Sequence, residues 1–138
     1  MSEKKIVGIT MGDPASIGPE ITVKAFADKS LYDLCNPVVV GDASVMEAAL
    51  PVVGHTEMKI NAIKDVSEAK YEYGTIDVLD MGLVDMAQLK RGEVSAMCGD
   101  AAFKYVTKVI ELAMDKKVDA TVTNAFNKEA VNLAGHHY

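Results

Sequence analysis

Apolar residues along this chain fall into short, nearly continuous runs separated by stretches with helical spacing. The runs are rich in Val and Ile, which is typical of strands that are buried on both faces of a sheet. The stretches between them repeat apolar residues every three or four positions, as amphipathic helices do. The pattern predicts strands over residues 5–11, 37–41 and 118–123, and helices over residues 18–29, 43–50, 95–116 and 127–134.

The predicted helices carry boundary residues that helices favour. Pro19 suits a first turn and Glu20 suits the positive end of the helix dipole. Pro51 is expected to end the second helix, and Gly135 to cap the last one. The residues that we expect on the inner faces are Ile21, Ala25 and Phe26 in the first helix, and Ala102, Val106, Val109, Ile110 and Ala113 in the long one.

Residues 51–80 have a weaker pattern, in which MKINAI and TIDVLDM alternate like strands around a loop or turn, VSEAKYEYG. The chain as a whole therefore alternates between strands and helices with short connections. Such an order is typical of a parallel sheet with helices on both faces. No repeat, low-complexity segment or linker divides the sequence. We predict an α/β fold with a largely parallel sheet, forming a single unit over residues 1–138.

Composition and charge exclude several classes of protein. The 138 residues are 49% hydrophobic and 25% charged, which suits one folded domain. A net charge of −6 disfavours nucleic acid and anionic membranes as partners. No apolar run is long enough for a signal peptide or a membrane span. Cys35 and Cys98 lie far apart in the sequence, so we expect a reduced, buried pair in a soluble, cytoplasmic protein.

The loop over residues 11–18, MGDPASIG, is the first candidate binding element. It follows a strand of a predicted parallel sheet, and ligands gather at the carboxyl ends of such strands. Gly12 and Gly18 allow the backbone to approach a ligand closely, and the amides at the start of the next helix attract anions. Asp13 can accept hydrogen bonds from hydroxyl groups. The loop matches neither GxGxxG nor a Walker A sequence, so a binding loop and a plain tight turn both remain open.

A second candidate loop, TVTNAFNKE, follows the last predicted strand. Its Thr, Asn and Lys side chains offer hydroxyl, amide and ammonium donors, which suit a phosphate or a carboxylate. The alternative is that Asn127 caps a helix and that Lys128 is solvated. Two polar loops at the same edge of a sheet make a shared cleft more plausible than either loop does alone.

Three segments in order carry a resemblance to a known family: MGDPASIGPE, GEVSAMCGDAAFKYV and VDATVTNAFNKEAVNLAGHHY. They resemble the 4-hydroxythreonine-4-phosphate dehydrogenases of pyridoxal phosphate biosynthesis, from residue 5 to residue 138. The first segment also looks like the GDGIGPE loop of isocitrate and isopropylmalate dehydrogenases, whose fold that family shares. The resemblance implies the N-terminal portion of a longer, two-domain dehydrogenase.

The resemblance implies NAD-dependent oxidation and decarboxylation of a small phosphorylated hydroxy acid, assisted by a divalent metal (Zn, Mg or Co). Threonate and erythronate 4-phosphates are further candidate substrates. Lys128 is implied as a phosphate contact or a proton-transfer group. By position, the residues implied at the cofactor are Gly12, Asp13, Ser16, Ile17, Gly18 and Glu20, and those implied at the substrate are Thr123, Asn127 and Lys128.

This sequence departs from the family pattern at two places, at Ser16, where Gly is usual, and at Asn124-Ala125, where a small residue precedes Pro. The family's three metal-binding histidines come later than residue 138. His136 and His137 are adjacent, so they make a poor metal pair. In the family, a substrate-binding turn with the sequence Gly-His-Thr-Glu follows the segment AGHHY. The GHTE string at residues 54–57 lies too early in the chain to be that turn. We therefore expect no metal site and no activity from this chain alone, which would be a truncated or surviving portion.

The exposed sheet edge of such a portion favours a homo-oligomer. Two other classes of function remain open. A binding or assembly module would retain NAD without turnover. A phosphate acyltransferase of related fold would bind coenzyme A or an acyl phosphate and would not respond to NAD.

Overall fold

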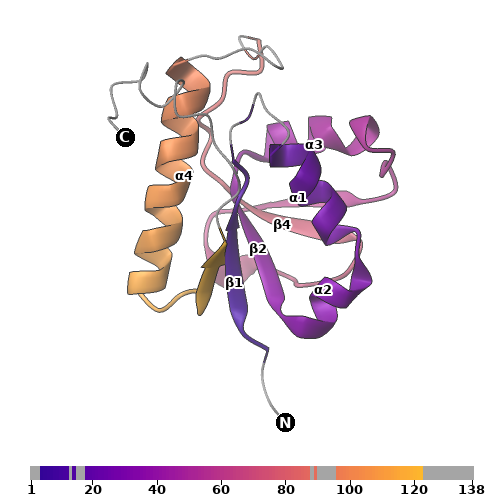
Figure 1. Ribbon diagram of the computed structural model, residues 1–138, viewed down its shortest axis with the longest axis vertical. Coiled ribbons are helices and arrows are strands. Elements are labelled where there is room, and N and C mark those ends of the chain that lie inside the picture. The colour runs from indigo at the N-terminus through magenta and orange to yellow at the C-terminus, as the bar shows by residue number, and fades with distance from the viewer. Residues whose placement is uncertain (1–3, 13, 15–17, 88, 90–95, 123–138) are drawn as a thin grey trace.

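Five short strands pair in parallel to form one sheet in the computed structural model, which describes residues 4–12, 14, 18–87, 89 and 96–122 (Figure 1). The strand order across the sheet is β3-β4-β2-β1-β5, and every pairing is parallel. The predicted parallel α/β fold is therefore confirmed. The strands are β1 (Ile6–Thr10), β2 (Asn36–Gly41), β3 (Lys59–Ile63), β4 (Thr75–Asp80) and β5 (Ala120–Val122).

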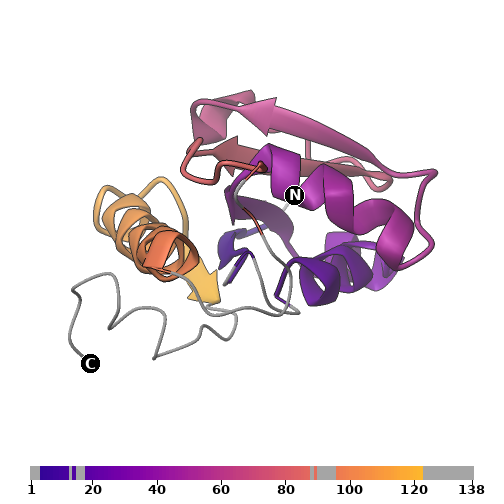
Figure 2. The same cartoon turned by 90° about the horizontal axis from the view of Figure 1, so that it is seen from above.

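Helices cover both faces of the sheet. On one face lie α1 (Gly18–Phe26), α2 (Lys29–Leu34) and α3 (Ala43–Val52), and on the other lies α4 (Ala96–Met114) (Figure 2). A short 3-10 turn, η1 (Val66–Glu68), connects β3 to β4. The connections that run across the sheet toward β3 contain α1, α2 and α3, whereas those that run toward β5 contain η1 and α4. Crossover connections of parallel strands share one handedness, so connections that run in opposite directions lie on opposite faces of the sheet.

The core is centred on β2, whose Val38, Val39 and Val40 are completely buried. β1 lies next to it and receives α4 on the second face. Gly8 of β1 makes this close approach possible, because a Cβ at that position would lie 2.7 Å from Val109 Cγ2 of α4. The sheet and α4 thus touch through a glycine, which fixes how deeply the helix sits.

The sequence located the strands correctly but merged two helices. The predicted helix over residues 18–29 ends at Phe26, and a separate α2 begins at Lys29. Asp28 starts it, because its side chain accepts hydrogen bonds from the Ser30 amide (3.0 Å) and the Ser30 hydroxyl (2.7 Å). An Asp at this position is a recognised helix start, and its signal was present in the sequence.

The predicted inner faces of two helices are partly wrong. In α1, Ile21 is 45% exposed and Ala25 is also exposed, while the predicted Phe26 is buried. The helix instead turns Thr22 and Val23 inward. Apolarity alone does not fix the rotation of a helix when apolar residues occupy more than one of its faces.

In α4, Ala102 and Val109 are buried as predicted, but Ile110 is 50% exposed. Val106 and Ala113 are only half-buried. The buried stripe of this helix consists of Cys98, Gly99, Ala101, Ala102, Tyr105, Val109 and Leu112. Tyr105 lies at the centre of this stripe. It was not predicted there, because its hydroxyl group is polar and the prediction used apolar residues.

Pro51 does not end α3, which continues to Val52. The proline lies in the last turn, where its missing N–H removes one hydrogen bond and leaves the rest of the helix intact. The Val53 amide still donates to the Ala49 carbonyl at 3.3 Å. The predicted end of this helix was therefore two residues too early.

Candidate functional site at the switch point of the sheet

The first candidate loop leaves β1 and the second leaves β5, and these two strands are neighbours. Ile9 of β1 pairs with Val122 of β5 in parallel register. The chain enters α1 on one face after β1, whereas it reaches β5 from α4 on the opposite face (Figure 2). In doubly wound α/β proteins, ligands bind at the carboxyl ends of the strands where the chain reverses in this way.

The loop after β1 is held at both of its ends by close backbone packing. The Met11 amide donates to the Val40 carbonyl at 3.0 Å, which extends the pairing with β2. Gly12 has a φ of 85°, a backbone conformation that glycine adopts without strain. A Cβ on Gly18 would lie 2.5 Å from the Met11 carbonyl oxygen, so the start of α1 can touch the end of β1 only through a glycine.

Asp42 lies immediately after β2 and is 1% exposed. Its Oδ1 accepts a hydrogen bond from the Tyr105 hydroxyl at 2.8 Å, and its Oδ2 accepts one from the Val84 amide at 2.7 Å. Burial, followed by the nearby Asp42 carboxylate, raises the pKa of Tyr105. The tyrosine therefore stays a neutral donor, and the bond ties α4 to the end of β2.

Asp80 ends β4, the next strand along. Its Oδ1 accepts hydrogen bonds from the amides of Ala43 and Gly82, each at 3.2 Å. Both carboxylates are thus engaged by the protein itself. Within the described residues, no group of three or more His, Cys, Asp or Glu side chains could hold a metal ion. This part of the edge fixes loops in place.

Three of the predicted site residues are described, and all three lie at this edge. Gly12 follows β1, Gly18 begins α1, and Glu20 occupies the first turn of α1 in a half-buried position. The other predicted site residues lie outside the described residues: Asp13, Ser16, Ile17, Thr123, Asn127 and Lys128. Four further residues considered above also lie outside them: Asn124, Ala125, His136 and His137.

The GHTE string lies between α3 and β3, at the amino end of β3 and therefore at the opposite edge of the sheet. His55 Nδ1 lies 3.0 Å from Glu57 Oε1, and the His55 side chain is half-buried whereas that of Glu57 is largely open to solvent. This hydrogen bond is the main cause that lowers the pKa of Glu57.

Sequence reasoning missed Asp42, Asp80 and Tyr105. A signal existed for Asp42, because it directly follows the predicted strand over residues 37–41, and the same rule that selected residues 11–18 applies to it. No such signal existed for Tyr105, which meets Asp42 across 63 positions of sequence.

Residues 33–138 match the model of a protein family described as pyridoxal phosphate biosynthetic protein PdxA. The chain belongs to this family. The match includes β2 to β5 and both helices α3 and α4, and it continues through the second candidate loop. The resemblance inferred from the three sequence segments is therefore confirmed.

Relatives with assigned names are dehydrogenases. A Halalkalibacterium halodurans protein with the provisional name D-threonate 4-phosphate dehydrogenase is 50% identical over 134 residues, which are 97% of this chain and 40% of that protein. A crystal structure of a 4-hydroxythreonine-4-phosphate dehydrogenase from Burkholderia phymatum has a TM-score of 0.95 and 47% identity, covering 99% of this chain and 41% of that one.

A third similar structure has a different named substrate. It is a terephthalate 1,2-cis-dihydrodiol dehydrogenase from Burkholderia xenovorans LB400, with 29% identity and a TM-score of 0.74 over 97% of this chain and 38% of that one. The chain thus spans about 40% of the length of the relatives that it matches. Among the described helices, none has the length and apolar character needed to cross a membrane.

Proposed function

We propose that this chain forms the part of an NAD-dependent dehydrogenase that builds one wall of the cofactor and substrate cleft. The substrate class is a small phosphorylated hydroxy acid, either 4-hydroxythreonine 4-phosphate or threonate or erythronate 4-phosphate, which is oxidised and then decarboxylated. The pairing of β1 with β5 carries this proposal, because both polar loops then leave one edge of the sheet together. Family membership and the names of the dehydrogenase relatives support the reaction class.

The cofactor side of the cleft is assigned to the loop after β1, with Gly12, Asp13, Ser16, Ile17, Gly18 and Glu20 as its residues. The glycine contacts support this assignment, since they bring bare backbone to the switch point. When bound, the nicotinamide would accept the hydride. The substrate side is assigned to Thr123, Asn127 and Lys128, with the Lys128 ammonium pairing with the phosphate or moving a proton at the hydroxyl group.

A divalent metal belongs to the proposed reaction, but the described residues do not fit one. Asp42 and Asp80 are two carboxylates at this edge, and both already accept hydrogen bonds from the protein. The part of the chain that the structure describes holds no group of three or more His, Cys, Asp or Glu side chains that could bind a metal ion. We derive no step through a metal from these residues.

We also propose a cytoplasmic homo-oligomer, since β5 lies at the end of the strand order and all three of its residues are exposed. Sedimentation of the purified chain over a range of concentrations tests the oligomer.

Calorimetric titration of the chain with NAD and NADP, followed by titration with the three phosphorylated acids, tests the proposed function. We expect NAD to bind, and Gly18→Ala to weaken that binding at least tenfold, because its new Cβ must displace the Met11 carbonyl. Lys128→Met should lower affinity for the substrate. Lys24→Met, which alters an exposed lysine in α1, is the matched control and should change neither.

The outcomes separate the classes of function. If NAD binds and none of the three phosphorylated acids changes its affinity, a binding module would be favoured. Binding of coenzyme A or an acyl phosphate without a response to NAD would favour a phosphate acyltransferase. An absence of any nucleotide binding by a folded chain would contradict the cofactor assignment of the loop.

A further inference from the structure

Asp42 precedes α3, at the position where an aspartate side chain usually caps a helix. Among the described residues, its side chain makes no such hydrogen bond. The Ala43 amide, which opens α3, donates instead to Oδ1 of Asp80 at 3.2 Å. A carboxylate from the neighbouring strand β4 therefore serves the start of this helix, and the Asp42 carboxylate is used for other contacts.

The Asp42 carboxylate joins two parts of the chain that are distant in sequence. The Tyr105 hydroxyl of α4 donates to Oδ1 at 2.8 Å, and the Val84 amide donates to Oδ2 at 2.7 Å. Burying a carboxylate costs free energy unless its hydrogen bonds are made, and removing a partner leaves the charge uncompensated. Both contacts are therefore held firmly, and the second one fixes a piece of backbone outside any helix or strand.

Val84 belongs to the segment over residues 81–87, which follows β4. Two carboxylates hold this segment at alternate amides. The Gly82 amide donates to Asp80 at 3.2 Å, and the Val84 amide donates to Asp42. The first half of the segment is thus attached to the ends of β4 and β2, and its course depends on both strands.

The segment and the loop after β1 lie on either side of the end of β2. The Met11 amide donates to the Val40 carbonyl at 3.0 Å from one side, and the Met81 amide donates to the Gly41 carbonyl at 2.9 Å from the other. The strand order places β2 between β1 and β4, so the two connections are separated by one strand, or about 10 Å. A dinucleotide that lies against the loop after β1 can reach across this distance.

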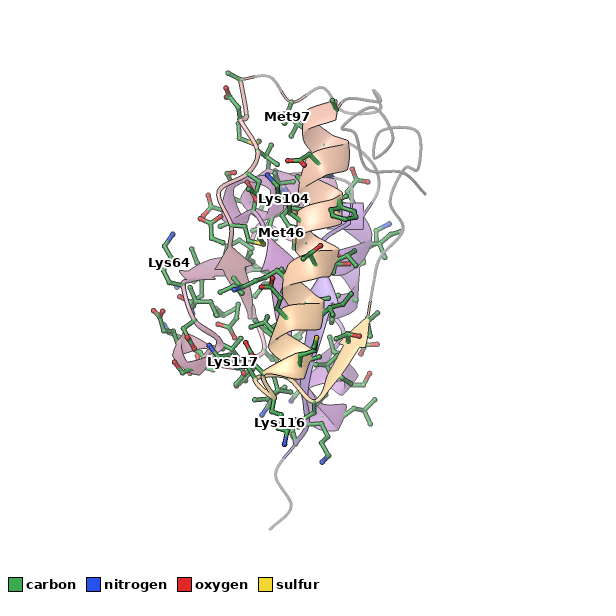
Figure 3. All side chains as sticks on the ribbon, turned by 90° about the vertical axis from the view of Figure 1, so that its left-hand side faces the viewer. Met46, Lys64, Met97, Lys104, Lys116 and Lys117 are labelled. Atoms are coloured by element: carbon green, nitrogen blue, oxygen red, sulfur yellow. The ribbon has the colours of Figure 1, made fainter. Side chains whose placement is uncertain are left out.

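The same segment also lies beside α4. Met81 lines a cavity together with Phe103, Lys104 and Thr107 of that helix. Figure 3 shows the chain after β4 passing along α4, on the side where Lys104 is labelled. Because α4 packs over β1 and β2, the chain between β4 and α4 starts and ends at the edge of the sheet that carries the candidate loops.

We propose that Asp42 is a positioning residue of the cofactor cleft, and that it holds the segment over residues 81–87 where this segment contacts the bound cofactor, across the end of β2 from the loop after β1. The inference rests on the proposed function and adds a second contact surface to its cofactor side. Asp42 acts through the Val84 amide and does not touch the cofactor itself. Moving a contact surface by even 1 Å can cost a large factor in binding or rate.

A pair of substitutions at one position separates positioning from charge. Asn at position 42 can keep both contacts, because its oxygen can accept from the Val84 amide while its amino group donates to the Tyr105 hydroxyl oxygen. Ala keeps neither contact. In calorimetric titration with NAD, we expect Asp42→Ala to weaken binding at least tenfold and Asp42→Asn to stay within about threefold of the wild type.

Asp77→Ala is the matched control. Asp77 is likewise 1% exposed and accepts hydrogen bonds from backbone amides, those of Lys70 at 3.1 Å and Tyr71 at 2.9 Å. These amides precede β4, so they lie at the other edge of the sheet. Asp77→Ala should lower the unfolding midpoint and leave the affinity for NAD unchanged, which separates a positioning residue from a merely structural one.

Amide chemical shifts of the labelled wild-type chain test the inference without any substitution, and so hold even if Asp42→Ala does not fold. We expect NAD to shift the amides of Gly82 and Val84 together with that of Gly12. The amides of Lys70 and Tyr71, at the other edge, should stay unchanged.

Three results would overturn the inference and leave the proposed function standing. In the first, NAD binds without shifting the amides of Gly82 and Val84. In the second, Asp42→Ala and Asp77→Ala weaken NAD binding equally. In the third, Asp42→Asn binds NAD as weakly as Asp42→Ala, so that charge and not position matters. A folded wild-type chain that binds no NAD would contradict the proposed function and this inference together.

Discussion

At the scale of single residues, a fully buried side-chain hydrogen bond joins Tyr105 to Asp42. Both groups are almost completely inaccessible to solvent, and they join a helix on one face of the sheet to the end of a central strand. Because a buried carboxylate requires all of its partners, the tyrosine hydroxyl contributes to stability as well as to the position of α4.

Replacing Tyr105 by Phe should therefore lower the free energy of unfolding by about 1–3 kcal/mol, since one oxygen of Asp42 is left unpaired. Urea unfolding followed by circular dichroism measures the change. Tyr73→Phe removes a hydroxyl hydrogen bond from a residue that is 52% exposed, and should cost less. Equal losses in the two variants would mean that the Asp42 oxygen finds water instead.

A second prediction concerns the end of α4, where Lys116 has a φ of 60°. The Lys117 amide donates to the Leu112 carbonyl at 2.8 Å and the Lys116 amide to the Ala113 carbonyl at 3.1 Å, which together form a Schellman motif with lysine in the glycine position. Lys116→Gly should stabilise the chain by about 1 kcal/mol by relieving this strain. Lys116→Ala removes the charge but keeps the Cβ, so it should give no such gain in the same unfolding experiment.

At the scale of elements, the strands were predictable and the helix faces were not. The apolar run over residues 37–41 has one interpretation, because a strand buried on both faces accepts apolar residues at every position. The run over residues 118–123 was also predicted as a strand, although all three residues of β5 are exposed. A helix has a single inner stripe, and Ile21 and Ile110 lie outside it even though both are apolar. Only packing against the sheet decides the rotation, and this packing depends on Gly8 and Tyr105.

Two neighbouring residues of α4 make this difference measurable. Val109 is completely buried against Gly8, whereas Ile110 is 50% exposed. Val109→Ala should lower the free energy of unfolding by about 2 kcal/mol, because it leaves a cavity against the sheet, while Ile110→Ala should cost less than about 1 kcal/mol. Thermal unfolding of the two variants side by side checks the order. A larger loss at Ile110 would contradict the observed rotation of α4.

At the scale of the whole molecule, the sequence predicted the edge of the sheet that carries the candidate site, because strand order along the chain and the rule for parallel sheets suffice for that. It did not predict the cavity of about 420 Å³ near the start of β1, which Ile6, Val66 and Tyr71 help to line. That cavity depends on Asp77 turning inward to bind the backbone at residues 70–71 and on Asp65 reaching Lys117, which lies 52 positions away. Contacts of this range leave no local pattern.

The response of the molecule to acid follows from two aspartates that cap short helical turns. Hydrogen bonds from Ser30 lower the pKa of Asp28, and hydrogen bonds from Ser67, followed by the charge of Lys117, lower the pKa of Asp65. A lowered pKa in the folded state gives stability that is complete above the usual aspartate value of about 3.9 and is lost as the pH falls through the lowered value.

We therefore expect the chain to lose stability progressively as the pH falls below about 4. The double variant Asp28→Asn and Asp65→Asn, which keeps side chains that can cap a helix, should show a shallower loss over this interval. Urea unfolding at several pH values measures both slopes. Identical slopes would show that other carboxylates dominate the acid response.

The parallel pairing of β1 with β5 also has a consequence for the order in which the molecule folds. β1 can pair with β2 early, since about thirty residues separate them. The pairing of β1 with β5 requires residues more than a hundred positions apart and follows the formation of α4. Contacts of such long range form slowly, and β5 contributes only three exposed residues. In native-state hydrogen exchange, the β5 amides should exchange well before those of β2. The β1–β5 edge of the sheet would then be the last part of the fold to form and the first to open.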